Sequence, residues 1–237
     1  MNYIKHILLF ALCLLPLQGF AQRRISADVQ VKTLAGGNVT TVTKSVYCSN
    51  NGRLVICFHT PLDYVLETNI LGESKYYFPS SNEVYVDNSG SVTAQDELLN
   101  IFLSGRLDDL GLSLSGYKLK STERLEDGMV KKTYQGVRAE LPQLCEIVFN
   151  RDYLPIYSAS LTEDGHPLVK VYYSRYENVG YYPFPHRSTE IIYNSPTDST
   201  IVRTIYSNLQ LDGSDTWFDF TVPEDAKPMD LSKALNK

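Results

Sequence analysis

The feature that most constrains this chain is a succession of short strand-like segments, each ended by turn-forming residues. From residue 25 onward, β-branched and aromatic side chains alternate with polar ones, as in strands that have one face in water. Gly-Gly-Asn at 36–38, Asn-Asn-Gly at 50–52 and Asp-Gly at 164–165 supply turns. Connections this short join antiparallel neighbours, which predicts a mostly β chain folded as a meander.

The alternation predicts strands along almost the whole chain, and no change of composition marks a linker between two halves. We therefore expect one domain over residues 22–237, a usual length for an all-β barrel or sandwich. The expected strands cover residues 25–33, 40–48, 53–59, 64–68, 75–78, 83–86, 112–120, 129–134, 144–150, 155–161, 168–176, 188–194, 200–209 and 218–222.

A different period appears between residues 93 and 110. Apolar side chains recur three and four positions apart at Leu99, Phe102, Leu103 and Leu107, which is typical of one face of a helix. Thr93 is a suitable N-cap and Gly111 a suitable stop. We predict a helix over residues 93–110, unusually apolar for a helix on a protein surface.

The N-terminus has the pattern of a secretory signal peptide. Lys5 precedes an apolar run from Ile7 to Leu17, and small residues stand at Gly19 and Ala21. The run is shorter than the roughly 20 residues that cross a bilayer, which disfavours a membrane anchor. We predict cleavage after Ala21 and a periplasmic or secreted protein whose mature chain has no transmembrane segment.

Three cysteines remain after such a cleavage: Cys48, Cys57 and Cys145. If Asn51-Gly52 is a two-residue turn, Cys48 faces Val55 and Cys57 is offset from it. Buried thiols are therefore favoured, while a Cys48–Cys57 disulfide stays open as an alternative.

Charge and motifs exclude several classes of function. The formal net charge is −5 with no block of Lys or Arg, which argues against nucleic-acid or anionic-membrane binding. His59, His166 and His186 have no metal-ligand spacing, and the sequence contains no phosphate loop or nucleophile elbow. We predict no catalytic residues, no metal and no cofactor; an exported hydrolase with unrecognised carboxylates is the least favoured alternative.

Several stretches carry a family likeness: residues 52–61 (GRLVICFHTP), 75–79 (KYYFP) with 82–85 (NEVY), 164–165 (DG) with 176–185 (YENVGYYPFP), and 217–223 (WFDFTVP). Together with the order of the features above, they resemble the periplasmic lipoprotein carriers of the LolA/LolB type and the related outer-membrane lipoprotein-sorting proteins. Thr60 stands where carriers of this family often have an arginine before the proline.

The resemblance implies an incomplete antiparallel β-barrel, a curved sheet with an apolar helical lid and a cavity for lipid or lipoprotein acyl chains. Alternation along the strands at 53–59 and 64–68 assigns one apolar set to the inner face. An envelope protein as partner on the same scaffold, or a solid core without ligand space, are the alternatives. The predicted cavity residues are Leu54, Ile56, Phe58, Tyr64, Leu66, Leu99, Phe102, Leu103 and Leu107.

Overall fold

The structure, a computed structural model, describes residues 23–90, 92–94, 97–195 and 197–229. The predicted signal peptide lies outside these residues. Within the described ranges, fourteen strands form one sheet, in the order β14-β6-β5-β4-β3-β2-β1-β13-β12-β11-β10-β9-β8-β7. All neighbours pair antiparallel except β14 with β6, which are parallel.

The strand bounds follow the predicted segments closely in most places. In the first half they are β1 (Arg24–Ala35), β2 (Asn38–Ser49), β3 (Leu54–Thr60), β4 (Tyr64–Thr68), β5 (Ser74–Phe78) and β6 (Glu83–Asp87). In the second half they are β7 (Tyr117–Arg124), β8 (Val130–Gly136), β9 (Leu144–Phe149), β10 (Pro155–Leu161), β11 (Pro167–Val179), β12 (Tyr182–Ser195), β13 (Asp198–Leu211) and β14 (Lys227–Pro228).

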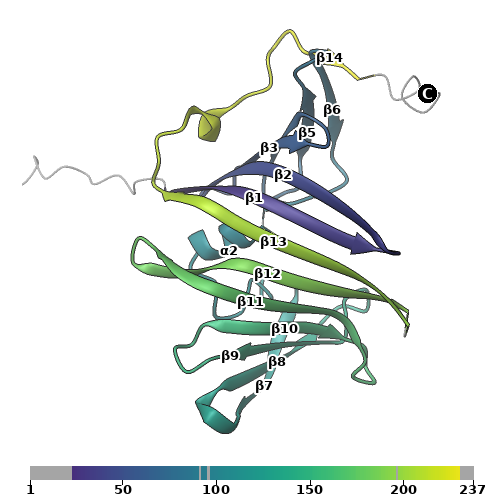
Figure 1. Cartoon of the computed structure of the whole chain (residues 1–237), viewed down its shortest axis with the longest axis vertical. Helices are drawn as coiled ribbons and strands as arrows, with labels where there is room; N and C mark the ends of the chain where they lie inside the picture. Colours follow the sequence, from purple (N-terminus) through teal and green to yellow (C-terminus); the bar gives the residue numbers. More distant parts are fainter. Residues whose placement is uncertain (1–22, 91, 95–96, 196, 230–237) are drawn as a thin grey trace, which may run out of the picture.

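The sheet is curved but not closed. Figure 1 shows the long strands β1, β13, β12 and β11 side by side, with β6 and β14 at one end of the molecule and β7 at the other. In the part of the chain that the structure describes, β14 and β7 are the two end strands of the sheet and do not pair with each other. The predicted mostly β, incomplete antiparallel barrel is confirmed.

The helix is present but much shorter than predicted. α2 (Leu98–Leu103) has six residues, and residues 104–116 form turns rather than further helix. Gly105 adopts φ 69°, its N–H bonds the Phe102 carbonyl, and the Arg106 N–H bonds the Ile101 carbonyl. This pair of hydrogen bonds is the Schellman ending, which glycine favours because it has no Cβ. Gly105, not Gly111, therefore ends the helix.

A helix of this size cannot cover the inner face of the sheet. Six residues rise about 9 Å, and a helix is about 10 Å across with its side chains. Fourteen strands spaced about 4.8 Å apart extend over roughly 60 Å of arc. α2 accordingly contacts β1 and β2, and the rest of the concave face must be covered by other segments or left open.

Three apolar clusters stabilise the fold, two of them on the concave face. The first joins α2 to β1–β4, β12 and β13, with Leu99 and Phe184 fully buried. The second lies on β7–β9, where Leu110 and Leu112 pack against Ile147 and Phe149. The stretch of concave face between these two clusters is formed by β10, β11 and β12.

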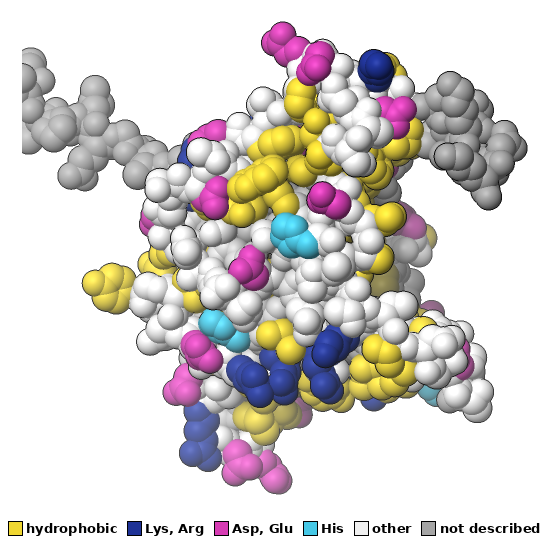
Figure 2. Space-filling model, turned by 45° about the horizontal axis from the view of Figure 1, so that its top comes forward, with side chains coloured by type: hydrophobic (Ala, Val, Ile, Leu, Met, Phe, Trp, Pro, Cys, Tyr) yellow, Lys and Arg dark blue, Asp and Glu magenta, His cyan; other side chains and the backbone are white. Residues whose placement is uncertain are grey.

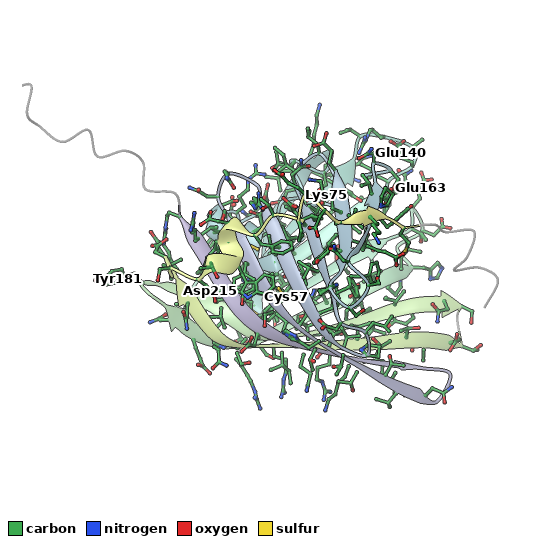
Figure 3. All side chains as sticks on the ribbon, turned by 90° about the horizontal axis from the view of Figure 1, so that it is seen from above. Cys57, Lys75, Glu140, Glu163, Tyr181 and Asp215 are labelled. Carbon is green, nitrogen blue, oxygen red and sulfur yellow. The ribbon has the colours of Figure 1, made fainter. Side chains whose placement is uncertain are left out.

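The third cluster lies on the outer face and contradicts one predicted strand. Residues 218–222 do not join the sheet; the chain forms a short 3-10 helix, η3 (Thr216–Asp219), and then runs over β2–β5. Trp217 and Phe220 pack there against Val55, Cys57 and Val65. Figure 3 shows Asp215 and Cys57 close together where η3 lies over the sheet. This segment shields an apolar patch of the convex face from water.

The three cysteines are free and buried. Cys48 pairs with Leu54 rather than Val55, because four residues, not two, connect β2 to β3. Cys48 belongs to the concave cluster and Cys57 to the convex one. Opposite faces of the sheet separate these two thiols, so the disulfide alternative is wrong for this structure.

Candidate functional site

The main candidate site is a trough on the concave face, beneath the segment that follows α2. A hollow of about 210 Å³ lies between Leu110 and Leu112 on one side and β9, β10 and β11 on the other. Ile147, Ser158 and Val171 face one another across its floor, as do Cys145, Ser160 and Val169. We call this hollow the trough. Its principal lining residues are Leu110, Leu112, Ile147, Val169, Val171 and Tyr173.

The chain over the trough is held in an unusual conformation. Leu110 has φ 49° and Gly111 has φ 78°, both in the left-handed region. For a leucine this conformation costs roughly 1–2 kcal/mol. Asp109 holds the turn, accepting hydrogen bonds from the Gly111 N–H at 2.8 Å and the Ser113 N–H at 3.3 Å. Strain at a segment that borders a hollow is a common property of binding sites.

A second hollow of about 180 Å³ lies on the other side of Leu110. It is bounded by Ile101 and Ser104 of the α2 end, by Arg106, and by Leu114. Leu110 lines both hollows, so the two hollows meet at this residue. Arg106 brings one cation to the second hollow, and its Nη1 is buried without a hydrogen-bond partner among the described residues.

Polar side chains also lie on the concave surface around the trough. Tyr173 Oη lies 3.2 Å from Ser158 Oγ, and burial raises the pKa of Tyr173 to about 12. Glu190 of β12 faces Val171 across the strand pair, and burial also raises the pKa of its carboxyl. Both shifts arise because an apolar setting disfavours the charged form. The trough therefore combines apolar walls with a few polar groups, the usual composition of a small-molecule site.

The nine predicted cavity residues are brought together, in the first concave cluster. Leu54, Ile56, Leu66, Leu99, Phe102 and Leu103 are buried there. Phe58, Tyr64 and Leu107 are half-buried and pack against it. Phe102 meets the ring of Phe184 edge-on at 5.1 Å. None of the nine lines the trough or the second hollow, so their role in lipid binding stays a prediction.

Half-exposed aromatic rings continue this cluster toward the β6 end of the sheet. Phe58 and Tyr64 stack at 4.2 Å, and Tyr64 lies 5.7 Å from Phe78 and 6.3 Å from Tyr76. Burial raises the pKa values of Tyr64 and Tyr76. The concave face is thus solid under α2, partly covered by rings on one side and hollow on the other.

An ion pair fixes the start of α2 to the sheet. Lys44 Nζ lies 3.7 Å from a carboxylate oxygen of Glu97, and both side chains are less than a fifth exposed. Tyr206 donates a hydrogen bond of 3.4 Å to the same carboxylate. Burial, and then the Glu97 charge, raise the pKa of Tyr206 well above its usual value. These contacts keep α2 against β1 and β2, which leaves the segment after it over the trough.

The sequence interpretation missed the trough residues because it assigned the site to the first half of the chain. A signal was present: Cys145, Ile147 and Phe149 alternate in one strand, and Val169, Val171 and Tyr173 alternate in another. What the sequence does not contain is the register that sets these two rows beside each other.

One constellation bears on the hydrolase alternative. Ser45 of β2 donates a hydrogen bond of 2.8 Å to Asp28, and His59 Nε2 lies 3.0 Å from the same hydroxyl. In a catalytic triad the serine donates to histidine and the carboxylate orients that histidine. Here the Ser45 hydroxyl donates its proton to Asp28, so His59 Nε2 can only donate to the Ser45 oxygen and is not positioned to take the serine proton as a base. The described residues contain no group of His, Cys, Asp and Glu suited to a metal ion.

Comparison with known proteins shows the fold. No protein-family model and no curated protein matches the chain. Among solved structures, a LolA superfamily protein from Nitrosomonas europaea has a TM-score of 0.58 at 14% identity, covering 85% of this chain and 92% of that one. A putative outer membrane lipoprotein-sorting protein domain from Vibrio parahaemolyticus has a TM-score of 0.55 at 10% identity, covering 83% and 89%.

A DUF1329 family protein from Desulfovibrio piger is similar to the same degree, with a TM-score of 0.57 at 15% identity over 84% of this chain and 90% of that one. The architecture of this chain is therefore the LolA-like fold. Identities this low show the fold alone, so function has to be argued from the residues of this chain.

Proposed function

We propose that this protein is an exported carrier or chaperone that holds an acyl chain of a lipid or lipoprotein on its concave face, without covalent chemistry. The observation behind the proposal is the trough, an apolar hollow bordered by Leu110 and Leu112 in a sheet of which α2 covers only part. Solved proteins of the same fold include one described as a lipoprotein-sorting domain, which favours the same class of cargo.

The size of the trough suits part of an acyl chain. A cavity of about 150 Å³ accommodates benzene, so 210 Å³ holds roughly eight carbon atoms. Burying about eight methylenes at about 0.8 kcal/mol each gives about 6 kcal/mol, a dissociation constant of order 10 µM. A longer chain would extend past Leu110 into the second hollow, where Arg106 can pair with an anionic head group.

The predicted cavity residues keep a place in this proposal. Phe58, Tyr64 and Leu107 are the half-buried members of the nine and stand at the edges of the solid region. We propose that they contact cargo, while the six buried residues hold α2 and the sheet together. Export after removal of residues 1–21, and action as one domain over residues 22–237, belong to the same proposal. Among the described residues no helix is long and apolar enough to span a membrane.

Native mass spectrometry of the protein purified from the periplasm tests the proposal. We expect bound species whose mass falls to that of the chain when an organic solvent extracts lipid. A purified protein of unchanged mass that also fails to bind a fluorescent fatty acid in titration would refute the carrier. An empty protein that retains another envelope protein would instead support the binding-module alternative.

A further inference from the structure

Four cations gather on the convex face of four neighbouring strands. Lys32 of β1 lies directly opposite Arg203 of β13, and Arg203 opposite Thr189 of β12. Because side chains alternate between faces, Arg187 shares the face of Thr189 two residues away. Thr189 in turn faces Tyr172 of β11, and Lys170 stands two residues from Tyr172 on that face. We call Lys32, Lys170, Arg187 and Arg203 the basic face.

These cations lack counter-ions among the residues that the structure describes. None of the four forms an ion pair with a described carboxylate, whereas Lys131, farther along the same face, lies 3.0 Å from Glu123. Glu190 of β12 alternates with Thr189 and points to the concave side. Figure 2 shows Lys and Arg side chains grouped together on this side of the molecule, and Figure 3 shows nitrogen-tipped side chains projecting outward from it.

Aromatic and aliphatic side chains are interleaved with the cations. Tyr157 and Tyr172 pack with ring centroids 5.2 Å apart, and Lys170 Nζ lies 5.3 Å from the centroid of Tyr193. Ile191 of β12 and Ile201 of β13 face each other within the same patch. Tyrosine is enriched at membrane interfaces because its ring is apolar and its hydroxyl polar.

We infer that the basic face docks this protein onto an anionic phospholipid surface. Lys and Arg would meet lipid phosphates while tyrosine and isoleucine reach the acyl boundary, a combination that a purely acidic protein partner does not require. The chain as a whole is acidic, with a net charge of −5, so only a face that concentrates cations can be attracted to an anionic lipid surface. The inference is independent of what occupies the trough.

The sequence prediction against anionic membranes rested on the absence of a basic block. The four cations come from positions 32, 170, 187 and 203, and only the pairing of β1 with β13 brings the first beside the others. Each Lys or Arg near an anionic surface strengthens binding about fivefold, so four give several hundredfold at low salt. The effect falls with ionic strength because the Debye length is about 8 Å at physiological salt.

Co-sedimentation of the exported protein with vesicles tests this inference. The vesicles are phosphatidylcholine alone, or two parts phosphatidylcholine to one part phosphatidylglycerol with the same acyl chains. The test variant carries Lys32→Glu, Lys170→Glu and Arg203→Glu. The control variant makes the same charge change on the exposed strand β7 with Lys118→Glu, Lys120→Glu and Arg124→Glu.

We expect binding to the anionic vesicles only, weakened by salt, and reduced at least tenfold in the test variant but less than threefold in the control. The inference would be overturned by equal binding to both vesicle types or by an equal loss of binding in both variants. It would also be overturned by no binding at all, or by binding only to an acidic protein. Fatty-acid titration should be unchanged in the test variant. A loss of fatty-acid binding would concern the trough proposal, whereas a loss of vesicle binding concerns the basic face, so failure of one proposal is distinguishable from failure of the other.

Discussion

Filling the trough should abolish acyl-chain binding without unfolding the protein. Ser160 lies on the trough floor between Cys145 and Val169, and its side chain is small and half-buried. Ser160→Trp places a bulky ring in a hollow of about 210 Å³. If the ring displaces half of the roughly eight carbon atoms that fit there, about four methylenes lose burial. At about 0.8 kcal/mol each, the loss is about 3 kcal/mol, or about 200-fold in dissociation constant.

The assay is displacement of a fluorescent fatty acid, with the melting temperature measured in parallel. Ser174→Trp is the matched control, because Ser174 is exposed and lies on β11, the strand that pairs with the β10 strand carrying Ser160. Overpacking at Ser160 costs about 1–3 kcal/mol, which lowers the melting temperature by roughly 2–12 °C for a chain of this size. Binding is therefore compared well below both transitions.

A folded Ser160→Trp protein that binds the fatty acid within about threefold of the unsubstituted one would refute the trough as the acyl-chain site. In that case the acyl chain, if bound, lies elsewhere, and the aromatic rings around Phe58 and Tyr64 become the site to test. Equal losses at Ser160 and Ser174 would show an effect of the added indole rather than of the trough.

Three further results are expected. Phe102→Ala should cost about 3–5 kcal/mol in the free energy of unfolding, measured by urea titration, because the side chain is 7% exposed; Tyr181→Ala, at 97% exposed, should change it little. Glu190→Gln should raise the melting temperature at neutral pH. Burial raises the pKa of the Glu190 carboxyl in the folded protein, so its ionisation lowers the stability of the unsubstituted protein as the pH rises through that pKa. The difference in melting temperature should vanish below about pH 4.3, where the carboxyl is protonated in both the folded and the unfolded protein. Cys57 should resist iodoacetamide at pH 8 until the protein unfolds, since burial raises its thiol pKa to about 12.

Strands were predictable because their signal is local. Period-two alternation and turn residues lie within each segment, so β4 and β10 have the predicted bounds and most others differ by one to three residues. The segment at 218–222 has the same local pattern, but its apolar side chains cover the outer face of β2–β5 instead of pairing. Local pattern alone does not distinguish a strand from a covering segment that buries the same residues.

The helix shows where a local signal is ambiguous. The apolar spacing from Leu99 to Leu107 continues through Ser104-Gly105, and a glycine inside such a pattern can be tolerated or can end the helix. In the structure the glycine ends the helix, and Leu107 and Leu110 lie on turns. The trough exists because of that ending: a helix continued to residue 110 would replace the turn that sets Leu110 and Leu112 over β9–β11.

Both proposed sites depend on register, which no local pattern contains. The trough requires Ile147, Ser158 and Val171 to be neighbours, and the basic face requires Lys32 to meet Arg203. A slip of one residue in any of these pairings would move every side chain of a strand to the other face. It would place Val171 outside and Lys170 within the barrel. The burial of Ile147 and Phe149 on one face of β9 opposes such a slip, so the same apolar alternation that fixes the hollow inside also fixes the cations outside.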